Sequence, residues 1–242
     1  MEVTHGTERS ATSGQLPGAR TGREAERSIR RGPRRVPAEF VAANQRDRLL
    51  DGVARTVAER GYAGARISDI CRAAGVTRPV FYELFAGKEH AVLSAYRAGT
   101  ALVVARMAEA YETAGGGADW PAAVRAGLRT LLDLLAETPP FAAMLVEIEA
   151  VGPAGRRARA RLLAEFRRFF ADAPPGPVGI PGAELTDALI GGVHAALYRW
   201  IDEDHVSELP GLLDTLVFLV VAPFGTASRP PRPSPTSAPP HG

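Results

Sequence analysis

Residues 67–85 read ISDICRAAGVTRPVFYELF, and this stretch decides the fold. Its apolar residues recur at intervals of three and four, which predicts two short helices, residues 67–74 and 78–85. Gly75 lies between them, where a tight turn favours a residue without a Cβ. Cys71 is small enough for the helices to pack closely. Five apolar side chains are predicted to share their core: Ile70, Ala74, Val76, Phe81 and Leu84.

Two short helices joined in this way are typical of a helix-turn-helix, whose second helix reads base edges from its N-terminal residues. Thr77 is placed to cap that helix. Arg78 can then form a bidentate contact to guanine, which contributes about 1–3 kcal/mol of discrimination. Taken singly, Tyr82 or Lys88 is an ordinary surface residue, so the prediction depends on the whole set. The predicted DNA-binding residues are Arg66, Ser68, Thr77, Arg78, Pro79, Val80, Tyr82, Glu83, Lys88, Arg34 and Arg35.

Arg34 and Arg35 belong to a basic segment before the first helix. The whole chain has a net charge of only +2, but between Arg20 and Arg35 seven arginines stand against two glutamates, a local net charge of +5. Residues 1–37 are therefore predicted to be a disordered basic arm that reaches the DNA minor groove or backbone. The alternative is a tail that only solubilises the protein. Residues 226–242 are predicted to be a Pro-rich, unpacked tail.

The rest of the sequence has a helical period and no β-branched alternation, so the fold class is all-α, with about nine helices. The first helix should end near Arg60, with Gly61 as its left-handed C-terminal residue. The predicted domains are a helix-turn-helix domain at 38–87 and a larger helical domain at 88–225. The further helices are expected at about 88–114, 119–138, 140–150, 154–172, 182–205 and 209–224.

Composition and motifs exclude several classes of protein. A single cysteine, Cys71, allows no intramolecular disulfide and favours a reducing compartment. No secretory signal is visible, and the longest apolar run, 216–224, is shorter than the ~18–20 residues of a membrane span. No nucleophile elbow, phosphate loop or metal-ligand spacing is found. We therefore expect a cytoplasmic protein that is not an enzyme, has no cofactor or metal and does not enter a membrane.

Residues 44–96 resemble the DNA-binding domain of the TetR/AcrR family of regulators. The matching features are Gly61-Tyr62, the Ala-Ala-Gly-Val-Thr turn at 73–77, Phe81-Tyr82 and Lys88-Glu89. The resemblance implies an all-helical homodimer with an N-terminal reading head and a C-terminal ligand-sensing domain. Two positions depart from the family pattern. Arg66 replaces the usual capping Ser or Thr, so the helix can instead begin at Ser68, and Leu84 replaces a frequent polar residue.

Under this resemblance the larger domain must both dimerise and sense a ligand. The last two helices are strongly apolar, so their surface must be buried. We expect a second subunit to bury it. The alternative is burial within one chain. The predicted dimer interface is Leu185, Leu189, Val193, Trp200, Leu213, Leu216, Val217 and Val220. The predicted ligand-pocket residues are Trp120, Phe141, Met144, Glu147, Ile148, His194 and Tyr198.

These observations predict a ligand-responsive transcriptional regulator, in the family's commoner mode a repressor. It would bind palindromic double-stranded operator DNA as a homodimer and be released by a small hydrophobic effector. The alternative is a DNA-binding protein of the same fold that is controlled by a protein partner or acts architecturally, without a small-molecule effector.

Overall fold

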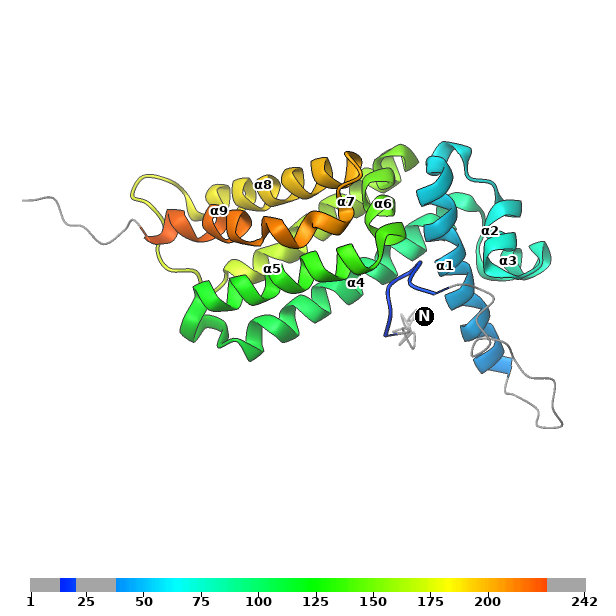
Figure 1. Ribbon diagram of the computed structural model, residues 1–242, viewed down its shortest axis with the longest axis horizontal. Coiled ribbons are helices and arrows are strands. Elements are labelled where there is room, and N and C mark those ends of the chain that lie inside the picture. The colour runs from blue at the N-terminus through cyan, green and yellow to red at the C-terminus, as the bar shows by residue number, and fades with distance from the viewer. Residues whose placement is uncertain (1–13, 21–37, 226–242) are drawn as a thin grey trace, which may run out of the picture.

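The computed structural model describes residues 14–20 and 38–225, and all the helices predicted above are found there. Figure 1 shows three N-terminal helices at one end of the molecule and a helical bundle that extends away from them. The described part contains no β-strand. The expectation of an all-α protein with two helical parts is confirmed.

The N-terminal part consists of α1 (Ala38–Gly64), α2 (Ile67–Ala74) and α3 (Arg78–Leu84). Gly61 interrupts α1 with a φ of 65°, at the position predicted for the left-handed residue. Gly75 ends α2 with φ 63° and ψ 36°, and Val76 donates its N–H to the carbonyl of Cys71 at 3.0 Å. The turn between α2 and α3 therefore has the geometry that the sequence predicted.

The core of this part also matches the prediction. Ile70, Ala74 and Phe81 are fully buried, whereas Val76 and Leu84 are half-buried and pack against them. One further close contact was not foreseen from the sequence. A Cβ on Gly52 of α1 would come within 2.8 Å of the carbonyl oxygen of Ile70, so α1 and α2 approach at this glycine.

The larger part begins with α4 (Lys88–Thr113), which packs along α5 (Trp120–Glu137). The remaining α-helices are α6 (Pro139–Glu147), α7 (Pro153–Glu165), α8 (Gly182–Asp202) and α9 (Leu213–Gly225). Three of the predicted helices are partly 3-10: residues 148–151 follow α6, 166–170 follow α7, and 206–212 precede α9. Helix α6 packs against α1 and so connects the two parts (Figure 1).

Residues 14–20 correct one expectation, because this segment of the predicted disordered arm is packed. Leu16 is buried, and the N–H of Gly18 donates to the carboxylate of Asp51 on α1 at 2.8 Å. Arg20 lies 3.8 Å from the same carboxylate, which is only 2% exposed. A buried carboxylate needs such partners, and composition alone did not reveal that they come from the arm.

The segment Val206–Gly225 is long and apolar enough to cross a membrane by length and composition, with a mean hydropathy of 1.6. It is not one continuous α-helix, since residues 206–212 are 3-10 and contain Pro210. Leu209, Leu216 and Val220 are buried against the rest of the chain. The segment therefore packs on the bundle by one face, and 28% of its apolar window is buried.

Candidate nucleic-acid interface and ligand cavity

Helix α3 presents its predicted reading side chains to solvent. Arg78, Pro79, Tyr82 and Glu83 are exposed, and Val80 is half-buried. Arg78 donates from its guanidinium to the Tyr82 hydroxyl, one turn away, at 3.5 Å. The Tyr82 ring stacks edge-on against the fully buried Phe81, with 5.5 Å between the ring centroids. The helix is thus anchored by one face, while the opposite face is free to enter a groove.

The two helix starts differ from expectation in their caps. Thr77 occupies the N-cap position of α3, but its side chain makes no capping hydrogen bond. Helix α2 begins at Ile67 with Arg66 as an uncapped N-cap residue, so the alternative start at Ser68 is wrong. Both Arg66 and Ser68 are exposed. Their proposed contacts to DNA stay predictions.

Lys88 has an internal role that the sequence did not indicate. Its ammonium donates to the carbonyl oxygens of Tyr62 at 2.8 Å and Ala65 at 3.1 Å. It also lies 4.4 Å from the centroid of the Tyr62 ring. The lysine therefore fastens the start of α4 to the end of α1. One N–H of the ammonium is left for an outside group, and the phosphate contact stays a prediction.

Another cation that sequence analysis missed stabilises the reading head. Arg48 of α1 donates to the carbonyl oxygens of Ala74 at 2.9 Å and Gly75 at 2.6 Å. These carbonyls end α2, where a cation is favourable. The predicted arm residues Arg34 and Arg35 lie outside the described residues.

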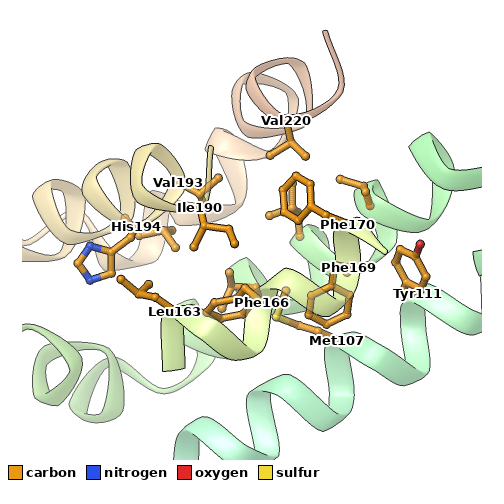
Figure 2. Close-up of a pocket in the computed structure, with 15 residues that line it drawn as sticks. Met107, Tyr111, Leu163, Phe166, Phe169, Phe170, Ile190, Val193, His194 and Val220 are labelled. Atoms are coloured by element: carbon orange, nitrogen blue, oxygen red, sulfur yellow. The ribbon is translucent and has the colours of Figure 1, made fainter. Parts of the chain in front are cut away.

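The larger part encloses an apolar cavity of about 80 Å³ (Figure 2). Its walls come from α4, α5, the segment from α7 to residue 170, α8 and α9. Figure 2 shows three aromatic rings from one segment at its centre, those of Phe166, Phe169 and Phe170. The sequence predicts a helix over these residues, but its periodicity does not distinguish them from core residues. The Phe-Arg-Arg-Phe-Phe run at 166–170 was the available signal.

Of the seven predicted pocket residues, only His194 lines this cavity. Phe141, Met144 and Ile148 are fully buried core residues instead. The Trp120 indole donates to the carbonyl of Phe169 at 2.8 Å and so stands behind the cavity wall. Side chains at intervals of three and four indicate burial, but they do not distinguish a cavity from a filled core. The two other predicted residues, Glu147 and Tyr198, lie between the cavity and the reading head.

Two polar groups reach the otherwise apolar cavity. Burial lowers the pKa of His194 below its ordinary value, and the charge of Arg159 acts in the same direction, while Glu149 opposes it. The imidazole is therefore neutral at neutral pH and can both donate and accept a hydrogen bond. Burial, with the nearby Asp172, raises the pKa of Tyr111 to about 12. The cavity thus suits an apolar molecule that carries few polar atoms.

Contacts link the cavity to the reading head. The His194 and Tyr198 rings are 5.6 Å apart, and the Tyr198 hydroxyl donates to the carbonyl of Val146 at 2.9 Å. The next residue, Glu147, accepts the backbone N–H of Tyr62 at 2.7 Å. Tyr62 in turn holds Lys88 at the start of α4. One side of the cavity is therefore connected by direct contacts to the junction between α1, α2 and α4.

The predicted dimer interface stays a prediction, but the structure packs its residues on the chain's own core. Leu189, Leu216 and Val220 are buried within the described chain, and Val193 and Val220 line the cavity. The other members of that set are half-buried against the core: Leu185, Trp200, Leu213 and Val217. The opposite face of α8 and α9 is exposed instead. It carries Phe218, which is 73% exposed, together with Leu219, Ala188, Gly191 and Ala195.

Comparisons with known proteins agree with this architecture. Residues 49–95 match the family model of the bacterial regulatory proteins of the tetR family. The fatty acid degradation regulator FadR from Bacillus halodurans is similar in structure, with a TM-score of 0.61 and 17% identity, covering 72% of this chain and 97% of that one. FadR from Bacillus subtilis, solved with stearoyl-CoA, has a TM-score of 0.62 and 18% identity, and the match covers 72% of this chain and 97% of that one.

A third similar structure is the TetR-family regulator PfmR from Thermus thermophilus. Its TM-score is 0.52 at 20% identity, and the match covers 73% of this chain and 95% of that one. No curated protein sequence matches the chain. The fold and the exposed helix α3 define a helix-turn-helix protein with a second, larger helical part that contains an apolar cavity. The family match identifies residues 49–95, the reading head, as a DNA-binding domain of the tetR family of bacterial regulatory proteins.

Proposed function

We propose that this protein is a repressor that binds palindromic operator DNA as a homodimer and is released when a small hydrophobic effector enters the apolar cavity. The observation that carries the proposal is the cavity, since one of its lining residues begins the contacts that end at the reading head. It would act in the cytoplasm, where its DNA target lies, and no catalytic step is part of the proposal.

DNA recognition is assigned to the exposed face of α3. Arg78 supplies a planar guanidinium for a guanine edge, and its contact with Tyr82 holds it on that face. Pro79 and Val80 supply apolar surface for a thymine methyl, whereas Tyr82 and Thr77 supply hydroxyls for phosphates. Arg66 and Ser68 at the start of α2, together with Arg34 and Arg35 of the arm, extend the contact to the backbone. Glu83 is exposed on the same helix and completes the proposed set.

A homodimer is proposed through the exposed face of α8 and α9, which lie side by side in Figure 1. Phe218 is a large exposed aromatic residue, and water contact with such a surface is unfavourable. The neighbouring positions on α8 are small, Ala188, Gly191 and Ala195, so a second copy can approach closely. Two reading heads joined in this way would address half-sites about one helical turn, ~34–36 Å, apart.

The effector is proposed to be apolar over most of its length. The ligand of the Bacillus subtilis FadR structure, stearoyl-CoA, makes a long acyl thioester the first compound to test. The cavity of about 80 Å³ is much smaller than the ~300–1,000 Å³ of pockets that hold drug-sized ligands. A long acyl chain would therefore have to displace the Phe166, Phe169 and Phe170 rings. A compound of a few carbon atoms would fit without displacing these rings.

The test is operator binding in the presence of hydrophobic compounds. The DNA upstream of the protein's own gene serves as the probe, and thermal unfolding identifies which thioesters or smaller apolar compounds bind. We expect at least one compound that raises the unfolding temperature to release the DNA. If compounds bind and DNA is retained, or if none from a broad library binds, the effector part of the proposal is wrong. Control by a protein partner would then be the better account.

A further inference from the structure

A second hollow lies on the other side of α7 from the apolar cavity. It is a groove of about 550 Å³ between α4 and α7, and we call it the arginine groove. Leu162, Glu165 and Arg168 line it, whereas Leu163, Phe166 and Phe169 of the same segment line the apolar cavity. The segment from α7 to residue 170 is therefore a wall with a separate hollow on each face.

The charge of this wall is one-sided. Residues 153–170 contain six arginines and a single acidic residue, Glu165. Two of the arginines have carboxylate partners, Arg159 with Glu149 at 3.0 Å and Arg167 with Asp187 at 2.7 Å. The other four form no ion pair within the part of the chain that the structure describes. Three of those four line the groove: Arg157, Arg161 and Arg168.

Arg97 adds a fourth guanidinium from α4, on the opposite side of the groove. Arg157 and Arg161 are four residues apart and so share one face of α7. From Arg157 to the end of α7 at Glu165 the helical rise of 1.5 Å per residue gives about 12 Å, and Arg168 lies beyond it in the 3-10 segment. Four guanidiniums stand against the single carboxylate of Glu165 in this lining, so the groove has a net positive charge that attracts an anion of several charges. A ligand with a single carboxylate would contact only one end of this row of arginines.

The floor of the groove is apolar. Tyr96, Val104 and Ala158 lie there and are buried, whereas the four arginines at the rim are exposed. Arginine matches phosphate because its planar guanidinium donates two parallel hydrogen bonds. The groove volume lies within the ~300–1,000 Å³ usual for small-ligand sites. A ligand with a flat apolar part and a chain of phosphates would satisfy both the floor and the rim.

We propose that the arginine groove binds a nucleoside polyphosphate, with its base on the apolar floor and its phosphates on Arg97, Arg157, Arg161 and Arg168. This site is separate from the effector cavity and does not depend on the function assigned to that cavity. Because one helical wall bounds both hollows, a ligand in the groove also stiffens the wall that carries the cavity's aromatic residues.

The test is calorimetric titration of the full chain with ATP, without DNA and at low salt. We expect one ATP to bind per chain. The double variant Arg157→Ala/Arg161→Ala should weaken binding by about tenfold or more, since each removes charge-assisted hydrogen bonds. Arg156→Ala is the matched control, because Arg156 is an exposed arginine of the same helix that does not line the groove. It should bind ATP within about twofold of the unchanged protein.

Three results would overturn the proposal. The first is an unchanged protein that binds no ATP, or a double variant that binds it as tightly as Arg156→Ala does. The second is inorganic tripolyphosphate binding as tightly as ATP, which would leave the base without a role. The third is a loss of operator affinity in the double variant but not in Arg156→Ala, which would assign the groove to the DNA backbone. Unchanged thermal unfolding of each variant verifies that it is folded.

Discussion

The carboxylate of Glu147, at the end of α6, accepts the backbone N–H of Tyr62 at 2.7 Å. The two residues are 85 positions apart in sequence and join the ligand domain to the reading head. Tyr62 follows Gly61, whose positive φ breaks α1, and a Cβ on Gly61 would lie 3.3 Å from the same carboxylate. Under the proposed function, a movement of α6 would therefore reach the point where α1 leads into the helix-turn-helix.

Replacing Glu147 should uncouple effector binding from DNA release. In Glu147→Ala the N–H of Tyr62 loses its charged partner, at a cost of about 1–2 kcal/mol in unfolding free energy. Operator affinity without effector should stay within a few fold, while the effector should release less DNA. Gel-shift titration with and without effector measures both quantities. Glu137→Ala, an exposed glutamate at the end of α5, is the control, and an equal response in both variants would refute the coupling.

Filling the cavity should abolish the effector response while DNA binding is kept. Val193 lines the cavity, so Val193→Phe puts a larger side chain into the space an effector would use. Overpacking typically costs about 1–3 kcal/mol, which the thermal unfolding midpoint would register. Val178→Phe, in an exposed loop, is the matched control. An effector that still binds Val193→Phe with unchanged affinity would show that the ligand lies elsewhere.

Charge on the exposed face of α9 should prevent dimerisation. Phe218→Arg removes a large apolar contact and would place two like charges at a twofold interface. Sedimentation should find a monomer at micromolar concentration, with weaker operator binding because only one half-site is held. Val217→Ala is a useful comparison, since Val217 is half-buried against the core and belongs to the inward stripe. A Phe218→Arg protein that remains dimeric would place the interface on another surface.

The free energy of unfolding of the ligand domain should decrease as the pH is lowered, because His194 becomes protonated. Burial lowers the pKa of this imidazole below its ordinary 6.5, so the folded state binds fewer protons than the unfolded state between the two values. The free energy of unfolding therefore decreases as pH falls below about 6.5. In His194→Gln this contribution is absent, and chemical denaturation at pH 7.5 and 5.5 should show a smaller decrease. Equal decreases in the two proteins would contradict the assignment.

The reading head was predictable from sequence because its local signals agree with one another. Gly75, Cys71 and Phe81 each satisfy a different demand of the same turn, and the structure places all three as expected. The caps were less predictable. Neither Thr77 nor Arg66 makes a side-chain cap, and the carbonyls that end α2 are bonded by Arg48, 26 residues away. Such long-range partners leave no local pattern.

The ligand domain was less predictable, since its helices are apolar over much of their circumference. In α9 both the inward Leu216 and the outward Phe218 are apolar, so periodicity could not say which stripe faces a partner. The cavity posed the same difficulty, because Phe141 is core whereas Phe166 lines an open space. Only packing between distant helices decides which apolar side chain meets a neighbour and which meets a void.

The most direct test of the central claim is a DNA footprint on the sequence upstream of the protein's own gene, repeated with Arg78→Ala and Tyr82→Ala. Both side chains are exposed on α3, so neither change should disturb the fold. Arg78→Ala should lose about 1–3 kcal/mol of affinity and relax base preference at one position of each half-site. Tyr82→Ala should weaken binding to all sequences alike. A footprint unchanged in both variants would contradict the assignment of α3 as the reading helix.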